Sequence, residues 1–144
     1  MNKEFVPYEQ ALSLKELEFD ELCICIYNRE KALRANVFNN SNDRFKSVQL
    51  SYNNGKIPAP LYQQAFRWFR EKYGLIGYIQ TSYITHEVVN NRNIPCTPRI
   101  EFTFGITNTI GKSIFSSFKQ GSFKTYEEAE LEGLKKLIEN FKQK

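Results

Sequence analysis

The sequence predicts an α+β fold in which an antiparallel sheet of four to five strands packs against three helices. Three observations carry this prediction: stretches with helical periodicity, alternating or β-branched stretches between them, and short turns rich in Asn and Gly. The expected order is α-β-β-α-β-β-(β)-α, with the helices against one face of the sheet. No repeat, low-complexity segment or linker interrupts it, so residues 1–144 are expected to form a single domain.

The first part of the chain is expected to hold one helix and two strands. Pro7 suits the first turn of a helix that ends near Asp20. Residues 22–27 follow as a strand dense in β-forming residues. Residues 28–46 are polar and loop-like, and the alternation in 48–52 predicts a second strand, which could pair with the first as a wide hairpin.

The second helix is predicted to open at Pro58–Pro60 and to end at Gly74, a natural C-cap. Its apolar face repeats at helical spacing and consists of Tyr62, Ala65, Phe66, Phe69 and Tyr73. Trp68 lies beside this stripe, where it either widens the apolar face or breaks the surface.

The rest of the chain predicts an antiparallel meander and a closing helix. A third strand covers residues 76–89, a fourth covers 99–104 after an Asn-rich turn, and a fifth covers 113–118. The last helix starts at a capping box formed by Thr125 and Glu128. Its acidic residues gather near the N-terminal end and its lysines toward the other end, as the helix dipole favours.

Composition sets limits on the class of protein. Aromatic residues reach 15%, with 12 Phe and 8 Tyr, which is more than a core of this size requires and suggests surface aromatics of the kind found at binding sites. The net charge of +4 allows an anionic partner without demanding one. No apolar stretch of membrane-spanning length and no signal-peptide pattern is present, so we expect a cytoplasmic protein without a membrane partner.

The chain carries no recognisable catalytic, metal-binding or phosphate-binding motif. His86 is the single His and lies in a strand-like context, and the three cysteines have no metal-ligand spacing. Glycine-rich nucleotide loops and H-E-x-x-H or EF-hand patterns are absent. We therefore predict no catalytic residue, metal or cofactor. An enzyme with a dispersed site remains the alternative, which a deep pocket around His86 or a cysteine would favour.

The strongest candidate for a binding site is the second helix, where cations and aromatics interleave as Arg67, Trp68, Arg70 and Lys72. Two arginines at i and i+3 suit a phosphate or carboxylate, and Trp68 could stack on a base or anchor a protein partner. The opposite interpretation is a solvated charged face behind a buried stripe, with Arg67 and Glu71 as an i, i+4 pair. The sequence leaves both open.

Three segments resemble a family of short, uncharacterised proteins of Bacteroidetes and their phages or prophages. They are FVPYEQAL at Phe5–Leu12, APLYQQAFRWFREKY at Ala59–Tyr73 and TYEEAE at Thr125–Glu130. A Gly before Phe-Asp-Glu is more typical of that family, where this chain has Glu18, so the end of the first helix is expected to differ locally. The resemblance implies a mobile-element accessory protein and brings no activity, cofactor or catalytic residue.

The function expected from these observations is non-enzymatic binding, of a host protein or of a small anionic, nucleotide-like ligand. The first alternative is a nucleic-acid-binding accessory domain that combines the same helix with Lys31, Arg34, Arg44 and Lys46. The second is the enzyme with a dispersed site.

Overall fold

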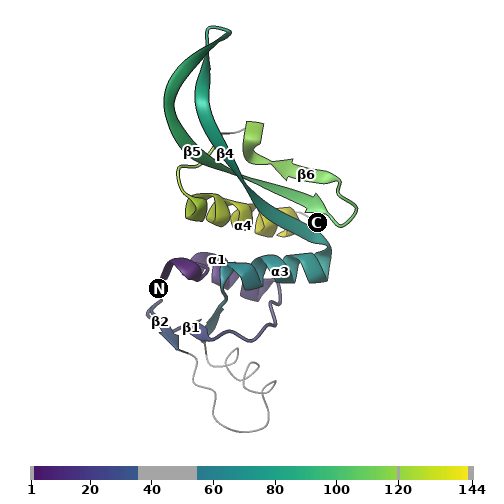
Figure 1. Ribbon diagram of the computed structural model, residues 1–144. Coiled ribbons are helices and arrows are strands. Elements are labelled where there is room, and N and C mark those ends of the chain that lie inside the picture. Colours follow the sequence, from purple (N-terminus) through teal and green to yellow (C-terminus); the bar gives the residue numbers. More distant parts are fainter. Residues whose placement is uncertain (1, 36–54, 120, 143–144) are drawn as a thin grey trace.

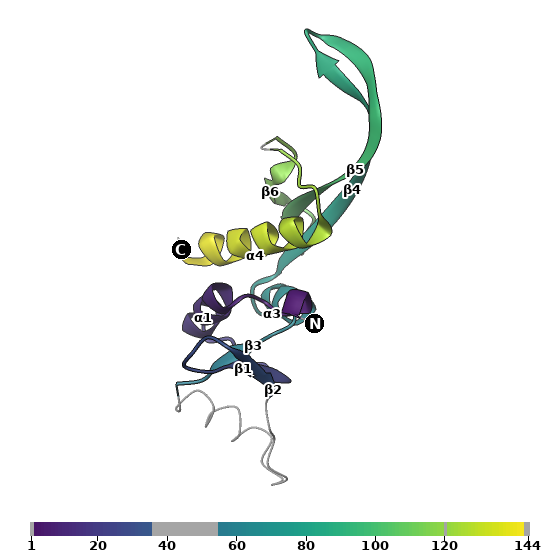
Figure 2. The same ribbon diagram turned by 90° about the vertical axis from the view of Figure 1, so that its left-hand side faces the viewer.

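A computed structural model describes residues 2–35, 55–119 and 121–142 and shows two sheets with helices between them (Figures 1 and 2). One sheet has the order β2-β1-β3 and the other β4-β5-β6. The strands are β1 (Cys25–Tyr27), β2 (Leu33–Ala35), β3 (Ile57–Ala59), β4 (Leu75–Val89), β5 (Arg92–Asn108) and β6 (Ser113–Ser116). The helices are η1 (Asn2–Glu4), α1 (Tyr8–Glu16), α3 (Tyr62–Tyr73), η2 (Ser117–Lys119) and α4 (Tyr126–Lys142).

The α+β class is confirmed, whereas the single sheet of four to five strands is wrong. The small sheet β2-β1-β3 lies beyond α1 and α3, while α4 packs under β4-β5-β6, so the helices separate the two sheets (Figure 2). The meander predicted for the second half of the chain is correct, since β4, β5 and β6 pair consecutively and antiparallel. The strand predicted at 48–52 lies outside the described residues.

The segment before α3 differs from its prediction because proline can sit at the edge of a sheet. Pro58 was expected to begin the helix but lies in β3, opposite Ile26, and the helix begins only at Tyr62. β3 is an edge strand, where a missing N–H costs no ladder hydrogen bond. The residue before each proline is biased toward extended backbone, which favours a strand over residues 57–59. The polar stretch after β1 likewise holds the unpredicted strand β2.

The hairpin between β4 and β5 is longer than its sequence suggested. Asn90 and Asn91 have φ values of 50° and 60°, the left-handed pair that a two-residue type I′ turn requires. β5 therefore begins at Arg92, directly after the turn, rather than at residue 99. Beyond α4 this hairpin extends as a two-stranded arm away from the rest of the molecule (Figures 1 and 2).

The core is continuous through the helical layers. It joins residues of α1, the small sheet, α3, the root of the β4–β5 hairpin and α4, and its largest fully buried side chains include Phe19, Phe69, Leu14, Ile106, Leu134 and Leu137. Gly133 of α4 packs against Phe104 of β5, where an added Cβ would lie 3.4 Å from the Phe104 side chain, in van der Waals contact. No helix in the described ranges has the length and apolar character needed to cross a membrane.

Two helices are followed by a residue in the left-handed conformation. After α3 this residue is a glycine, which adopts the conformation without strain, and after α1 it is a glutamate, which does not. Gly74 ends α3 with φ 64° and donates its N–H to the Arg70 carbonyl at 3.1 Å. α1 ends at Glu16, earlier than the expected residues 19–20, because Glu18 has φ 64° and Phe19 N–H reverts to the Leu14 carbonyl at 3.0 Å. Glu18 is the position at which the resemblance leads one to expect Gly.

Glycine and non-glycine substitutions at these two caps should therefore have opposite effects on stability. Glu18→Gly is expected to raise the free energy of unfolding by about 0.5–1 kcal/mol, and Gly74→Ala to lower it by about 1 kcal/mol or more, since only Gly adopts positive φ without strain. Urea denaturation followed by circular dichroism measures both. Equal signs for the two variants would contradict this account of the helix ends.

Candidate functional site

A groove runs between α3, the free edge of β4 and the first turns of α4. Its volume is about 610 Å³, within the range of small-molecule sites. Four side chains of α3 at i, i+3, i+4 and i+7 spacing form one wall, namely Gln63, Phe66, Arg67 and Arg70. The remaining lining residues are Leu61, Gln64, Gly77, Tyr78, Ile79, Tyr126 and Glu130.

Two glycines fix the shape of the strand beside this groove. A Cβ on Gly77 would lie 2.6 Å from the Phe66 ring, so the absence of a side chain lets this ring lie against β4. On the same hairpin, Tyr78 pairs with Gly105, and a Cβ on Gly105 would lie 2.4 Å from the Tyr78 ring. The Phe66 and Tyr78 rings thus lie directly over the backbone of the hairpin at these two glycines.

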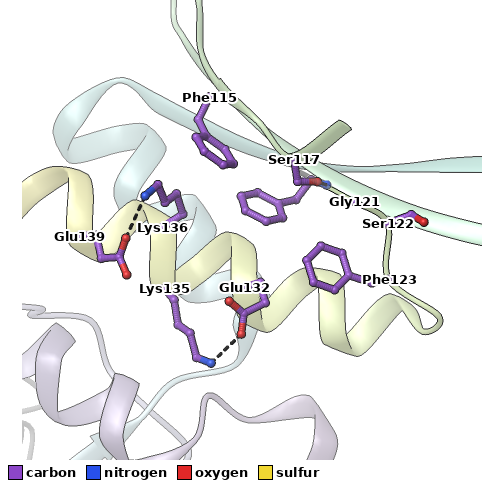
Figure 3. A pocket seen from close by; sticks show the side chains of 10 residues that line it. Phe115, Ser117, Gly121, Ser122, Phe123, Glu132, Lys135, Lys136 and Glu139 are labelled. Atoms are coloured by element: carbon purple, nitrogen blue, oxygen red, sulfur yellow. Dashed lines mark hydrogen bonds and ion pairs between the residues drawn. The ribbon is translucent and has the colours of Figure 1, made fainter. Parts of the chain in front are cut away.

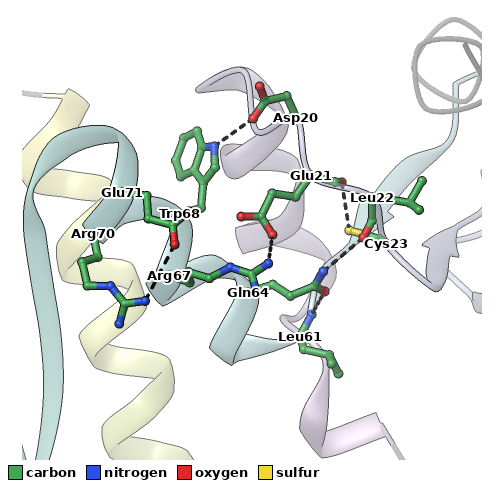
Figure 4. Close-up of polar contacts among 10 residues, drawn as sticks. All are labelled: Asp20, Glu21, Leu22, Cys23, Leu61, Gln64, Arg67, Trp68, Arg70 and Glu71. Carbon is green, nitrogen blue, oxygen red and sulfur yellow. Dashed lines mark hydrogen bonds and ion pairs between the residues drawn. The ribbon is translucent and has the colours of Figure 1, made fainter. Parts of the chain in front are cut away.

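The two arginines of the groove differ in how far they are already paired. Arg67 Nη2 donates to Glu21 Oε2 at 2.5 Å, and this hydrogen bond raises the pKa of the guanidinium (Figure 4). Arg70 Nη2 lies 3.9 Å from Glu71 Oε1, too far for a hydrogen bond (Figure 4). Both side chains are exposed, so Arg70 has the larger share of its donors available to an anion.

The α4 side of the groove is acidic and aromatic. Tyr126 is 47% exposed and its ring meets Phe102 edge-on at 6.0 Å. Burial, with the charges of Glu4 and Glu127, raises the pKa of Glu130 to about 6. A second hollow of about 260 Å³ shares Leu61, Gln63, Tyr126 and Glu130 with the groove and adds Glu4 and Glu127. The groove therefore has cationic residues on α3 and a carboxylate of raised pKa on α4.

The four residues singled out on this helix do not act together. Arg67 and Arg70 line the groove, but Trp68 and Lys72 do not. Trp68 is 3% exposed, packs on Phe19, Phe69 and Tyr73, and donates Nε1–H to Asp20 Oδ1 at 3.1 Å (Figure 4).

Burial of Trp68 corrects the expectation that it stacks on a base or anchors a partner, because its indole face is covered by the core. Lys72 lies over this indole, with Nζ 4.9 Å from the ring centroid and 3.4 Å from the Glu18 carbonyl. Both residues therefore serve packing between α3 and the end of α1.

A third hollow, of about 360 Å³, lies between α4 and the end of the meander (Figure 3). Its phenylalanines are Phe104, Phe115 and Phe123, and Ser117 Oγ is used to accept the Phe104 N–H at 2.9 Å. Its cations are paired on their own helix, Lys135 with Glu132 at 2.6 Å and Lys136 with Glu139 at 3.0 Å (Figure 3). It offers fewer available charged donors than the groove on α3.

The other candidate residues of the sequence do not converge on a site in the described part of the chain. His86 lies exposed on the arm, with Nδ1 2.9 Å from Thr85 Oγ1. Cys23 is buried, which raises the pKa of its thiol to about 12, while Cys25 and Cys96 are half-buried. Residues 2–35, 55–119 and 121–142 bring together no group of three His, Cys, Asp or Glu that could hold a metal ion.

Sequence reasoning missed the residues of the groove that α4 and β4 contribute. In the sequence, Tyr126 belongs to the capping-box segment, Glu130 to the acidic residues that favour the helix dipole, and Tyr78 to a strand rich in β-forming residues. Only the packing of α4 beside α3 brings Tyr126 and Glu130 next to Gln63. The available signal was a carboxylate one turn after an exposed aromatic, which is too common in helices to stand out.

Comparisons with protein-family models, curated proteins and solved structures gave no match.

Substitutions of Trp68 and Lys72 test which residues of α3 belong to the core and which are exposed. Trp68→Ala is expected to lower the free energy of unfolding by about 3–5 kcal/mol, because it leaves a cavity between three aromatic rings. Lys72→Ala should change it by less than about 1 kcal/mol, as for most exposed residues. Chemical denaturation measures both, and an equally small effect at Trp68 would contradict its assignment to the core.

Glu130 makes a pH-dependent contribution to stability. Its pKa is raised from 4.5 to about 6, so the folded state binds this proton more tightly than the unfolded state does. The resulting destabilisation is absent below pH 4.5, develops between pH 4.5 and 6, and is complete above, on the order of 1–2 kcal/mol. Glu130→Gln should therefore stabilise the protein at pH 8 but not at pH 4, whereas Glu139→Gln, at an exposed position of α4, should show no such gain. Thermal unfolding at both pH values decides this.

Proposed function

We propose that the protein is a non-enzymatic binding protein that holds a small anionic, nucleotide-like ligand in the groove on α3. The observation that carries the proposal is the placement of Arg67 and Arg70 in the same groove as exposed Tyr126 and the half-buried Glu130. Arg70 offers a planar donor fork without a close carboxylate partner in the described structure, which suits the oxygens of a phosphate.

The wall of the groove formed by α4 suits the heterocyclic half of such a ligand. A heterocyclic ring placed against Tyr126 would gain stacking area on a side chain that is half exposed. Glu130 could accept a hydrogen bond from an exocyclic amine or, when protonated, donate one to a ring nitrogen, because its raised pKa makes both states accessible near neutral pH. Gln63 adds a neutral donor and acceptor between the two ends of the groove.

A nucleic acid has less support as the partner. Of the cations proposed for it, Lys31 is paired with Glu9 at 2.8 Å and belongs to the region of the small sheet, on the far side of α1 and α3 from β4 (Figure 2). Arg34 lies in β2 of the same sheet, and Arg44 and Lys46 fall outside the described residues. Among the described residues, Lys31 and Arg34 do not form one basic face with Arg67 and Arg70.

The biological setting of the proposal depends on the sequence resemblance. A small binding protein of a phage or prophage of Bacteroidetes would act in the host cytoplasm as an accessory that sequesters a host nucleotide or engages a host protein.

Arg70→Ala tests the proposal. Binding is first sought by thermal shift with a panel of mononucleotides, cyclic nucleotides and the matching nucleosides, and is quantified by calorimetry. We expect a nucleotide to bind and Arg70→Ala to weaken it about tenfold or more, the loss of a charged hydrogen bond.

Lys72→Ala is the matched control, since it removes one positive charge from the same helix on the side away from the groove. It should leave the affinity unchanged. The proposal fails if no member of the panel binds, if nucleosides bind as well as nucleotides, or if both variants weaken binding equally.

A further inference from the structure

The β4–β5 arm is a long ribbon that nothing in the described chain covers. No residue between 80 and 102 is buried, and Tyr83 and Val88 are 69% and 71% exposed. The nine residues Thr81–Val89 of β4 span about 30 Å at the rise of an extended strand. An isolated two-stranded ribbon is at best marginally stable in water, so this arm gains from a partner.

The two edges of the arm differ in a way that indicates where a partner can pair. The β5 edge carries Pro95 and Pro98, and a bulge between Ile84 and His86 leaves residues 96–98 of β5, against Thr85 alone of β4, out of the ladder. Proline, bulges and basic residues are the devices by which proteins protect a sheet edge from pairing. Between Thr81 and Val89, the β4 edge has no proline, lysine or arginine.

The hydrogen-bonding groups along the β4 edge follow from the register. His86 pairs with Pro95, which has no N–H, so this pair is a non-hydrogen-bonded one and the His86 N–H points away from β5. Val88 pairs with Asn93 two residues further on and has the same orientation. His86 and Val88 therefore present backbone donors and acceptors to the open side of the ribbon, and Asn93 does so on the opposite edge.

Charge on the arm argues against an anionic partner. Arg99 is held by Glu87 and Glu101, each at 2.6 Å, so its charge is satisfied within the ribbon. On the β4 edge, Glu87 is the sole formally charged residue among Thr81–Val89. The Phe102 N–H and carbonyl bind Phe123, so Thr81, which pairs with Phe102, and Tyr83 also turn their backbone groups to the open side. In the antiparallel register that brings these groups together between two copies, His86 lies opposite Tyr83 and Val88 opposite Thr81. Glu87 then lies opposite Ser82, so no like charges meet.

We propose that the free edge of β4 pairs antiparallel with β4 of a second copy of this chain, which joins two meanders into one continuous six-stranded sheet. The pairing is isologous, because each copy offers the same edge to the other about a two-fold axis. The contact is the length of one nine-residue edge and falls at the low end of interface sizes, so we expect a dimer that dissociates at concentrations on the order of 10 µM.

Val88→Pro and Asn93→Pro form a matched pair that tests the edge. Each removes an outward N–H at one of two directly opposed positions, so the hairpin ladder is preserved in both variants. Sedimentation velocity over a concentration series is expected to show a monomer–dimer equilibrium for the natural chain and for Asn93→Pro, and monomer alone for Val88→Pro. Circular dichroism confirms that each variant is folded.

Amide hydrogen exchange of the natural chain gives a second readout that needs no variant. Exchange at His86 and Val88 should slow with increasing protein concentration, while exchange at Asn93 stays constant. A monomer at all concentrations overturns the proposal. A dimer that persists in Val88→Pro also overturns it. The same holds if an added partner protects the β4 edge while the chain itself stays monomeric.

Discussion

The burial of Trp68 is the interaction on which the rest of the arrangement depends. Its indole packs on Phe19 and Tyr73 and its N–H is bound by Asp20, so the segment after α1 is held against α3. That attachment also places Glu21 beside Arg67. Because the buried face of α3 is fixed in this way, the opposite stripe with Arg67 and Arg70 must face β4 and α4. The orientation of the groove is thus a consequence of core packing.

α3 and β4 are joined by a single residue, and this tight connection relates the core to the arm. Gly74 allows the chain to reverse from helix into strand, and the Phe66 ring can lie against β4 only because Gly77 has no side chain. The same strand then continues past α4, where it loses its helical cover (Figure 2). One strand therefore supplies a wall of the groove at its beginning and an open sheet edge at its end.

The elements with strong local signals were predictable, and their assembly was not. The stripe of α3, its Gly74 cap, the capping box of α4 and the meander follow from spacing and local hydrogen bonding. β2 and β3 have three residues each and depend on pairing with β1, which periodicity cannot reveal. The sequence also does not show that Arg67 and Arg70 line the groove while Trp68 and Lys72 pack against the end of α1. Which neighbouring positions of a helix are buried depends on the segments that pack on it, and these are distant in the sequence. Tyr126 and Glu130 enter the groove through contacts between distant segments.

Local charge pairing, rather than net charge, distinguishes the proposed small anionic ligand from a polyanion. A chain with four excess positive charges could favour nucleic acid, yet Lys31, Arg67 and Arg99 each have a close carboxylate at hydrogen-bonding distance. A polyanion gains affinity by replacing counterions on several unpaired cations spread along one face, and paired cations contribute little to that gain. Arg70 differs because, within residues 2–35, 55–119 and 121–142, it pairs only with Glu71, at 3.9 Å, and because it lies inside a groove. One available guanidinium beside a second, partly paired one matches a single phosphate group better than a phosphate backbone.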